Sequence, residues 1–277
     1  MKAALIAPGS RRAVGHIIDA APLVAVPILG ETLIAYWLEH LATKGFKEVT
    51  LVVTDRPETI RAVVGNGARW GLRLVIATEL REPTVEQVKE KHPDAELFVL
   101  DRLPTQEAEL FTTYQGWLKQ MLAWMPQAAK GHRIGLRERS PGVWVGLRAQ
   151  IASSAILQGP CWIGDHARIG PEAVVGPNAI IESQVVLESA CEVQDSWVGP
   201  ETFVGSLTRV KDSFAWGSQL INIRTNSCTQ VPDAFLLSSL SQKSAGPVFS
   251  ERVANIFQAS FTRPLGLLSS IAQRNRR

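Results

Sequence analysis

The stretch Ile163-Gly-Asp-His-Ala-Arg-Ile169-Gly-Pro-Glu-Ala-Val174 decides the fold of this chain. An aliphatic residue, Ile163, returns after six positions as Ile169, and an alanine stands four positions after each of them. Sequence repetition at a fixed period is the signature of a repeat architecture, in which neighbouring units bury each other's apolar faces. We therefore followed this period outward in both directions.

The six-residue period extends far beyond the quoted stretch. Every sixth residue from Val145 to Val193 is aliphatic, and almost every residue four positions later is small or β-branched. A single step of five residues then leads to Val198. The period resumes there with Val204, Val210 and Trp216.

A triangular coil explains this pattern. Each side is a short strand whose aliphatic residue points inward, and each corner is a turn supplied by pairs such as Gly164-Asp165 and Gly170-Pro171. A β-sandwich would show a period of two instead. We predict a parallel β-helix over residues 143–240. The units resemble those of hexapeptide-repeat proteins, and this resemblance implies a left-handed sense.

The first part of the chain alternates between short apolar runs and helical patterns, which predicts an α/β domain with parallel strands over residues 1–135. The strands are expected at residues 2–7, 49–53, 72–77 and 97–100. The helices are expected from residue 33 to near Gly45, and at residues 58–64, 85–91 and 106–125.

The third predicted part is a C-terminal helix with a basic tail, residues 245–277. Residues 233–244 are polar and predict the exit from the coils, and residues 251–261 carry an apolar stripe at helical spacing. We interpret the stripe as a packing face. Membrane association of the Arg-rich tail is not expected.

Composition argues against several classes of protein. A net charge of +3 does not favour a nucleic-acid partner. Three widely separated cysteines do not form a disulfide framework or a zinc motif. No apolar run approaches the roughly 18 residues that a membrane span needs, and the N-terminal apolar run is too short for a signal peptide. We expect a cytoplasmic protein.

Three segments of the first domain resemble the sugar-1-phosphate nucleotidyltransferases, also called nucleoside-diphosphate-sugar pyrophosphorylases. Residues 2–12 match the strand and glycine-rich nucleotide loop of that family. Residues 22–36 match the segment that leads into its first long helix, and residues 64–75 match its glycine-rich stretch before a strand. The resemblance implies a Rossmann-like nucleotidyltransferase-type domain, followed by the left-handed β-helix in a common family layout.

The resemblance also implies a site. Gly9, Ser10 and Arg12 would bind the nucleotide, and Arg11 and Asp101 would be catalytic, with Asp101 as the ligand of Mg²⁺ if the enzyme is active. Such enzymes join a nucleoside triphosphate to a sugar-1-phosphate and release pyrophosphate. Cations and Mg²⁺ offset the phosphate charge in this kind of reaction.

The chain departs from the family pattern in ways that weaken catalysis. Ala21 stands where the family has a lysine, and the repeats begin at Val145, where the second half of the catalytic domain is expected. We therefore predict a degenerate nucleotidyltransferase-like protein of sugar-nucleotide metabolism that acts as a regulatory or scaffold subunit of polysaccharide precursor synthesis. Its expected partners are a nucleotide or nucleotide sugar, a catalytic subunit, and further copies bound through the β-helix.

The alternative function is a hexapeptide-repeat acyltransferase. Proteins of that class commonly trimerise and use a histidine near the seam between subunits as a base. His166 is the single histidine of the repeats. It lies within a regular unit and not on an extended loop, so a plain surface histidine is the competing interpretation. The sequence leaves open whether the chain is an enzyme.

Overall fold

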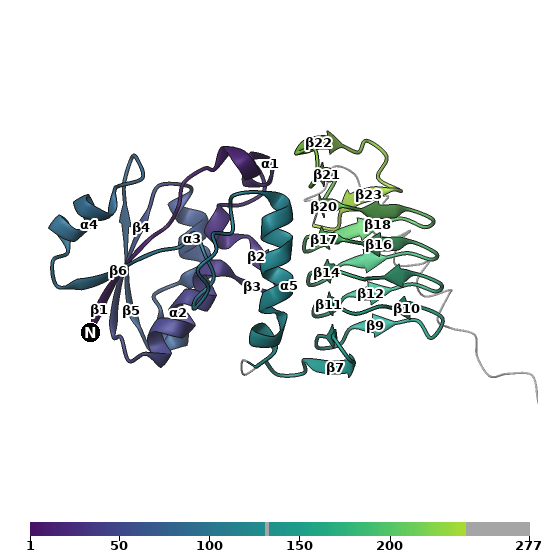
Figure 1. Ribbon diagram of the computed structural model, residues 1–277, viewed down its shortest axis with the longest axis horizontal. Helices are drawn as coiled ribbons and strands as arrows, with labels where there is room; N and C mark the ends of the chain where they lie inside the picture. The colour runs from purple at the N-terminus through teal and green to yellow at the C-terminus, as the bar shows by residue number, and fades with distance from the viewer. Residues whose placement is uncertain (131–132, 242–277) are drawn as a thin grey trace, which may run out of the picture. The chain divides into compact units, whose positions relative to one another are not determined.

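The computed structural model describes residues 1–130 and 133–241 of the 277-residue chain. An α/β half is followed by a stack of parallel coils (Figure 1). Four parallel strands form the sheet of the first half, in the order β5-β4-β1-β6. They are β1 (Lys2–Ile6), β4 (Glu48–Val53), β5 (Arg73–Thr78) and β6 (Ala95–Val99).

Helices and short turns connect these strands. The α-helices before α5 are α1 (Gly15–Ile18), α2 (Leu33–Thr43), α3 (Pro57–Val64) and α4 (Val85–Lys91). The 3-10 turns are η1 (Arg12–Val14), η2 (Leu23–Ala25) and η3 (Ala68–Trp70), and β2 (Pro27–Ile28) pairs antiparallel with β3 (Glu31–Thr32). Helix α2 begins after Thr32, whose hydroxyl accepts the Ala35 N–H at 3.3 Å.

The last helix of this half differs from the prediction. Helix α5 (Tyr114–Lys130) begins eight residues later than the expected start at Gln106. The Leu110 N–H donates to the Asp101 carbonyl at 2.7 Å and so holds the preceding loop against the end of β6. A backbone group engaged in this way is not available for the i to i−4 ladder of a helix.

The coils confirm the predicted parallel β-helix architecture, while its left-handed sense stays a prediction. The three faces are formed by stacked parallel strands. The first face holds β8 (Val143–Val145), β11 (Cys161–Ile163), β14 (Ala179–Ile181), β17 (Ser196–Val198) and β20 (Ser213–Trp216). The second holds β9 (Gln150–Ile151), β12 (Arg168–Ile169), β15 (Val186–Leu187) and β18 (Thr202–Val204). The third holds β10 (Ile156–Leu157), β13 (Val174–Val175), β16 (Glu192–Gln194) and β19 (Arg209–Lys211).

The interior of the coils contains the predicted aliphatic series. Val145, Ile163 and Val198 belong to one buried cluster with the small residues that follow them. Two tryptophans depart from the predicted pattern. Because the coils shorten by one residue, Val198 pairs with Ala215, so Ala215 and not Trp216 lies in this interior. Trp197 pairs with Phe214 and packs outside the coils.

The outer side of the first face explains why the two halves form one body. Its residues Trp162, Trp197 and Phe214 share a hydrophobic cluster with helix α5, which lies along this face (Figure 1). The rings of Trp117 and Phe214 are 5.7 Å apart. Met1–Leu240 consequently form one compact unit. The division into residues 1–135 and 143–240 stays a prediction.

Antiparallel strands flank the coils at both ends. Strand β7 (Arg137–Ser140) pairs with β8 at the beginning, and β21 (Gln219–Asn222) and β22 (Ser227–Gln230) follow β20 at the end. Strand β23 (Leu237–Ser239) pairs with β18. The predicted helix at residues 251–261 and the basic tail lie outside the described residues. Among the described helices, none has the length and apolar character needed to cross a membrane.

A glycine substitution tests the stacking of the coils. A Cβ atom at Gly170 would lie 2.7 Å from the carbonyl carbon of Glu188 in the next coil. We expect Gly170→Ala to lower the free energy of unfolding by about 1–3 kcal/mol, because backbone must move to relieve the overlap. A Cβ atom added at Gly15 would meet no atom of another part of the chain within 4 Å. Gly15→Ala is therefore the control and should be neutral or slightly stabilising. Urea unfolding that shows equal stability for the two variants would contradict the stacking.

Candidate functional site

The predicted nucleotide loop is occupied by a side chain of the protein itself. The Gly9 N–H donates to Glu82 at 2.9 Å, and both terminal nitrogens of Arg11 donate to the same carboxylate at 2.7 and 2.6 Å. The hydrogen bond from Arg11 is the main cause that lowers the pKa of Glu82. Gly9, which we predicted to bind the nucleotide, and Arg11, which we predicted to be catalytic, therefore bind an internal anion.

Glu82 was not among the predicted site residues. It follows β5, and the carboxyl ends of parallel strands meet at one edge of a sheet, where ligands commonly bind. An acidic residue in that loop was the signal that could have been used. Ser10 and Arg12 have exposed side chains. Their proposed contacts with a nucleotide stay predictions.

Asp101 lies near the same edge but is engaged by its neighbour. Its carboxylate accepts two hydrogen bonds from Arg102, at 2.8 and 3.3 Å. It also raises the pKa of Arg11 through its charge, after the larger effects of Glu82. Within residues 1–130 and 133–241, no three His, Cys, Asp or Glu side chains gather to hold a metal ion. The structure thus brings Gly9, Arg11 and Asp101 together, as parallel strands predict, and pairs the two charged side chains internally.

A second group of polar contacts lies where the coils meet the α/β half. Glu182, in the turn after β14, is fully buried, and its carboxylate accepts the N–H groups of Leu29 and Gly30, each at 2.8 Å. The indole N–H of Trp197 donates to the same carboxylate at 3.1 Å. Burial raises the pKa of Glu182, and the three donors oppose this effect.

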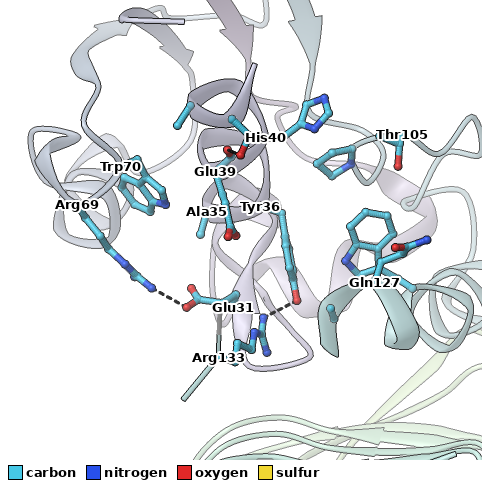
Figure 2. A pocket seen from close by; sticks show the side chains of 15 residues that line it. Glu31, Ala35, Tyr36, Glu39, His40, Arg69, Trp70, Thr105, Gln127 and Arg133 are labelled. Atoms are coloured by element: carbon cyan, nitrogen blue, oxygen red, sulfur yellow. Dashed lines mark hydrogen bonds and ion pairs between the residues drawn. The ribbon is translucent and has the colours of Figure 1, made fainter. Parts of the chain in front are cut away.

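Two cavities adjoin this contact. The larger one, of about 640 Å³, lies over α2 between η3 and α5. The smaller one, of about 260 Å³, reaches the β-helix at Trp162, Gly164 and Asp165. The cavities share Glu31, Arg69 and Arg133. Figure 2 shows these three residues together at one end of the larger cavity, with His40 and Thr105 at the other end.

His166 follows directly after Asp165, which lines the smaller cavity. It lies at an exposed corner of the coils in a left-handed backbone conformation, with φ of 58°. Its N–H donates to the Leu147 carbonyl at 2.8 Å, and Asp165 accepts the Leu147 N–H at 2.6 Å. The corner is therefore fixed by backbone contacts to the previous coil, and the imidazole is left exposed.

No protein-family model matches the chain, and a search of curated proteins finds no relative. Among solved structures, the chain is similar to a mutant of GDP-perosamine N-acetyl transferase from Caulobacter crescentus in complex with CoA and GDP-perosamine. That match has 13% identity and a TM-score of 0.18, and it covers 61% of this chain and 79% of the other.

Two further structures give similar values. The acetyltransferase domain of PglB from Neisseria gonorrhoeae, in complex with acetyl coenzyme A, is 9% identical with a TM-score of 0.18. It covers 62% of this chain and 86% of that one. Another perosamine N-acetyltransferase mutant from Caulobacter crescentus is 13% identical with a TM-score of 0.19. It covers 63% and 95% of the two chains. At these identities and scores, the contacts within this chain have to carry any functional argument.

Two predictions are corrected by these findings. The expected nucleotidyltransferase-like protein of sugar-nucleotide metabolism, acting as a regulatory or scaffold subunit, is wrong: the loop predicted to bind the nucleotide holds an acid of the protein, with Gly9 and Arg11 bound to Glu82, and the solved structures found are N-acetyltransferases. Mg²⁺ as the cofactor is wrong as well, because Asp101, its predicted ligand, is bound by Arg102 and belongs to no group of three metal-binding side chains among the described residues.

The raised pKa of Glu182 predicts a pH dependence. A carboxyl group that titrates at higher pH in the folded protein binds more protons in that state, so its contribution to stability is present at low pH and is lost as pH rises. We expect the stability difference between wild type and Glu182→Gln to fall as pH rises from about 4.3 through the folded pKa. The slope should approach about 1.4 kcal/mol per pH unit.

Urea unfolding of the two proteins across this pH range measures the difference directly. The comparison cancels the titration of all carboxyl groups that the two proteins share. A difference that grows with pH would mean that the three donors outweigh the cost of burial, and it would contradict the prediction.

Proposed function

We propose that this chain is an acyltransferase of the hexapeptide-repeat class, with His166 as its general base. The observation that supports the proposal is the position of His166 at an exposed, rigidly bonded corner of the coils, next to a residue that lines a cavity. His166 itself does not line the cavity, but Asp165 does. An acceptor that occupies the smaller cavity would reach the corner along Gly164 and Asp165.

The chemistry requires one base and two substrates. The nitrogen of an amine acceptor attacks the carbonyl carbon of an acyl thioester, and the carbon–sulfur bond breaks. The imidazole of His166 takes the proton from the attacking nitrogen and then delivers it to the departing thiolate, so that an amide and a free thiol are formed. Histidine suits this role because its unperturbed pKa lies near neutral pH.

The surroundings of the corner suggest where the two substrates bind. The acceptor would bind in the smaller cavity. Arg69 and Arg133 provide positive charge there for the phosphate groups of a carrier such as a nucleotide-linked amino sugar. His166 is exposed on its other side. We propose that the thioester binds on this exposed side of His166. Its site would be the groove that forms when a second copy of the chain packs beside the coils, as in the predicted homo-oligomer.

The proposal is tested by thiol release from acetyl coenzyme A, with GDP-perosamine and simpler amino sugars as acceptors. We expect the wild type to release thiol with at least one acceptor, and His166→Ala to reduce kcat by about 10²–10⁴-fold, the usual contribution of a general base. Thermal unfolding of the variant should match that of Gln184→Ala, because both side chains are exposed and both residues have a left-handed backbone.

Gln184 offers a matched control for this substitution. It occupies the same corner one coil further on, is also exposed, and has φ of 60°. Gln184→Ala imposes the same backbone cost without removing an imidazole, so its activity should remain close to that of the wild type. No thiol release by the wild type with any acceptor, or equal losses in the two variants, would refute the proposal.

A further inference from the structure

The larger cavity has the dimensions and the walls of a ligand site. Its volume of about 640 Å³ lies within the usual range of roughly 300–1,000 Å³ for small-molecule pockets. Helix α2 supplies the floor, η3 one wall and α5 the other (Figure 2). The lining is completed by residues that lie outside these three elements, namely Glu31, Pro104, Thr105 and Arg133.

Positive charge gathers at one end of this cavity, and only part of it is neutralised. Arg69 forms an ion pair with Glu31 at 2.7 Å. Arg133 instead donates to two uncharged oxygens, the Leu29 carbonyl and the Tyr36 hydroxyl, the latter at 2.6 Å. In the part of the chain that the structure describes, no carboxylate lies within ion-pair distance of Arg133, although the buried Glu182 is near enough for the charge of Arg133 to lower the pKa of Glu182. Its remaining N–H groups can receive an anion from outside, because a guanidinium has more donors than these two contacts use.

Aromatic rings surround this charge. The guanidinium of Arg133 lies 5.5 Å from the ring centre of Tyr36, and that of Arg69 lies 5.3 Å from the ring centre of Trp70. Tyr36 in turn packs edge-on against Trp124, with centroids 5.9 Å apart. Such an arrangement offers flat apolar and cationic surfaces on which a planar ring can stack.

The opposite end of the cavity carries little positive charge. His40 lies there (Figure 2), and its pKa is lowered, first by burial and then by the charge of Lys44. A histidine with a lowered pKa is neutral at pH 7 and provides one donor and one acceptor. The anionic group of a ligand is therefore expected at the arginine end, and an uncharged ring or polar substituent toward His40.

We propose that this cavity binds a small molecule consisting of a planar ring with one anionic group, a carboxylate or a phosphate. Arg133 binds the anion, and Trp70 packs against the ring. The cavity does not include His166, and binding in it does not depend on acyl transfer, although the cavity shares Arg69 and Arg133 with the smaller cavity of the proposed function. The two anionic groups share one chemistry here, since a guanidinium binds both through paired N–H donors.

Isothermal titration calorimetry of the full chain with two matched pairs tests the proposal. The first pair is indole-3-acetate and indole-3-acetamide, and the second is AMP and adenosine. In at least one pair we expect the anionic member to bind about tenfold more tightly or better than the neutral one. A preference in the first pair alone identifies a carboxylate ligand, and in the second alone a phosphate ligand. No preference in either pair overturns the proposal.

Two variants locate the binding. Arg133→Met should abolish the preference for the anion, whereas Arg73→Met, at an exposed arginine of β5, should leave it intact. Trp70→Ala should weaken the binding of both members of a pair, because both contain the planar ring. This substitution leaves the contact between Arg133 and Leu29 in place. Unchanged binding in Arg133→Met or in Trp70→Ala would also overturn the proposal. His166→Ala should bind these probes as the wild type does, so a failure of the acyltransferase proposal would be seen separately.

Discussion

The buried carboxylate of Glu182 is the contact on which the arrangement of the two halves depends. Moving a carboxylate out of water is costly unless donors replace the lost hydration. Here two donors are consecutive N–H groups of one turn, made possible by left-handed conformations at Leu29 and Gly30, with φ of 54° and 81°. Because α2 begins three residues later, the same contact determines where Tyr36 and the cavity floor lie relative to the coils.

Apolar packing beside this contact turns two folds into one body. The outward side of a β-helix coil usually faces water, but here it presents Trp162, Trp197 and Phe214 to helix α5. Tyr114 and Trp117 of that helix stack on the aromatic face, 5.2 and 5.7 Å from Phe214. The hydrophobic effect therefore holds the two halves together. The hydrogen bonds of Glu182 fix the orientation of one half relative to the other, since hydrogen bonds are far more sensitive to angle than dispersion contacts are.

The sequence predicted the coils well because their constraint is local and repeated. The interior of the coils accepts only aliphatic and small residues, so these residues recur in the sequence at a fixed period. A coil that is one residue shorter shifts the phase of this period but does not end it. The same reasoning failed at Trp216, where the six-residue period predicted an inward side chain but the shortened coil places Ala215 in the interior. Glu182 and Glu82 were missed for another reason: their partners are 153 and 73 residues away, so the sequence near each residue does not name its partner, even where an acid in the loop after β5 could have marked Glu82 as a candidate.

The distribution of charge decides between the two possible ligand regions. At the edge of the parallel sheet, Arg11 is bound to Glu82 and Arg102 to Asp101, so an incoming anion would have to displace an acid of the protein. At the junction, Arg69 is likewise paired with Glu31, but Arg133 faces uncharged oxygens and aromatic rings. The buried Glu182 acts on Arg133 only through its charge and forms no direct ion pair with it. A half-buried cation whose N–H groups meet uncharged oxygens gains more from an external anion than a cation already paired does. Within the described chain, anion binding is consequently favoured at the junction cavity and opposed at the loop that most resembles a nucleotide site.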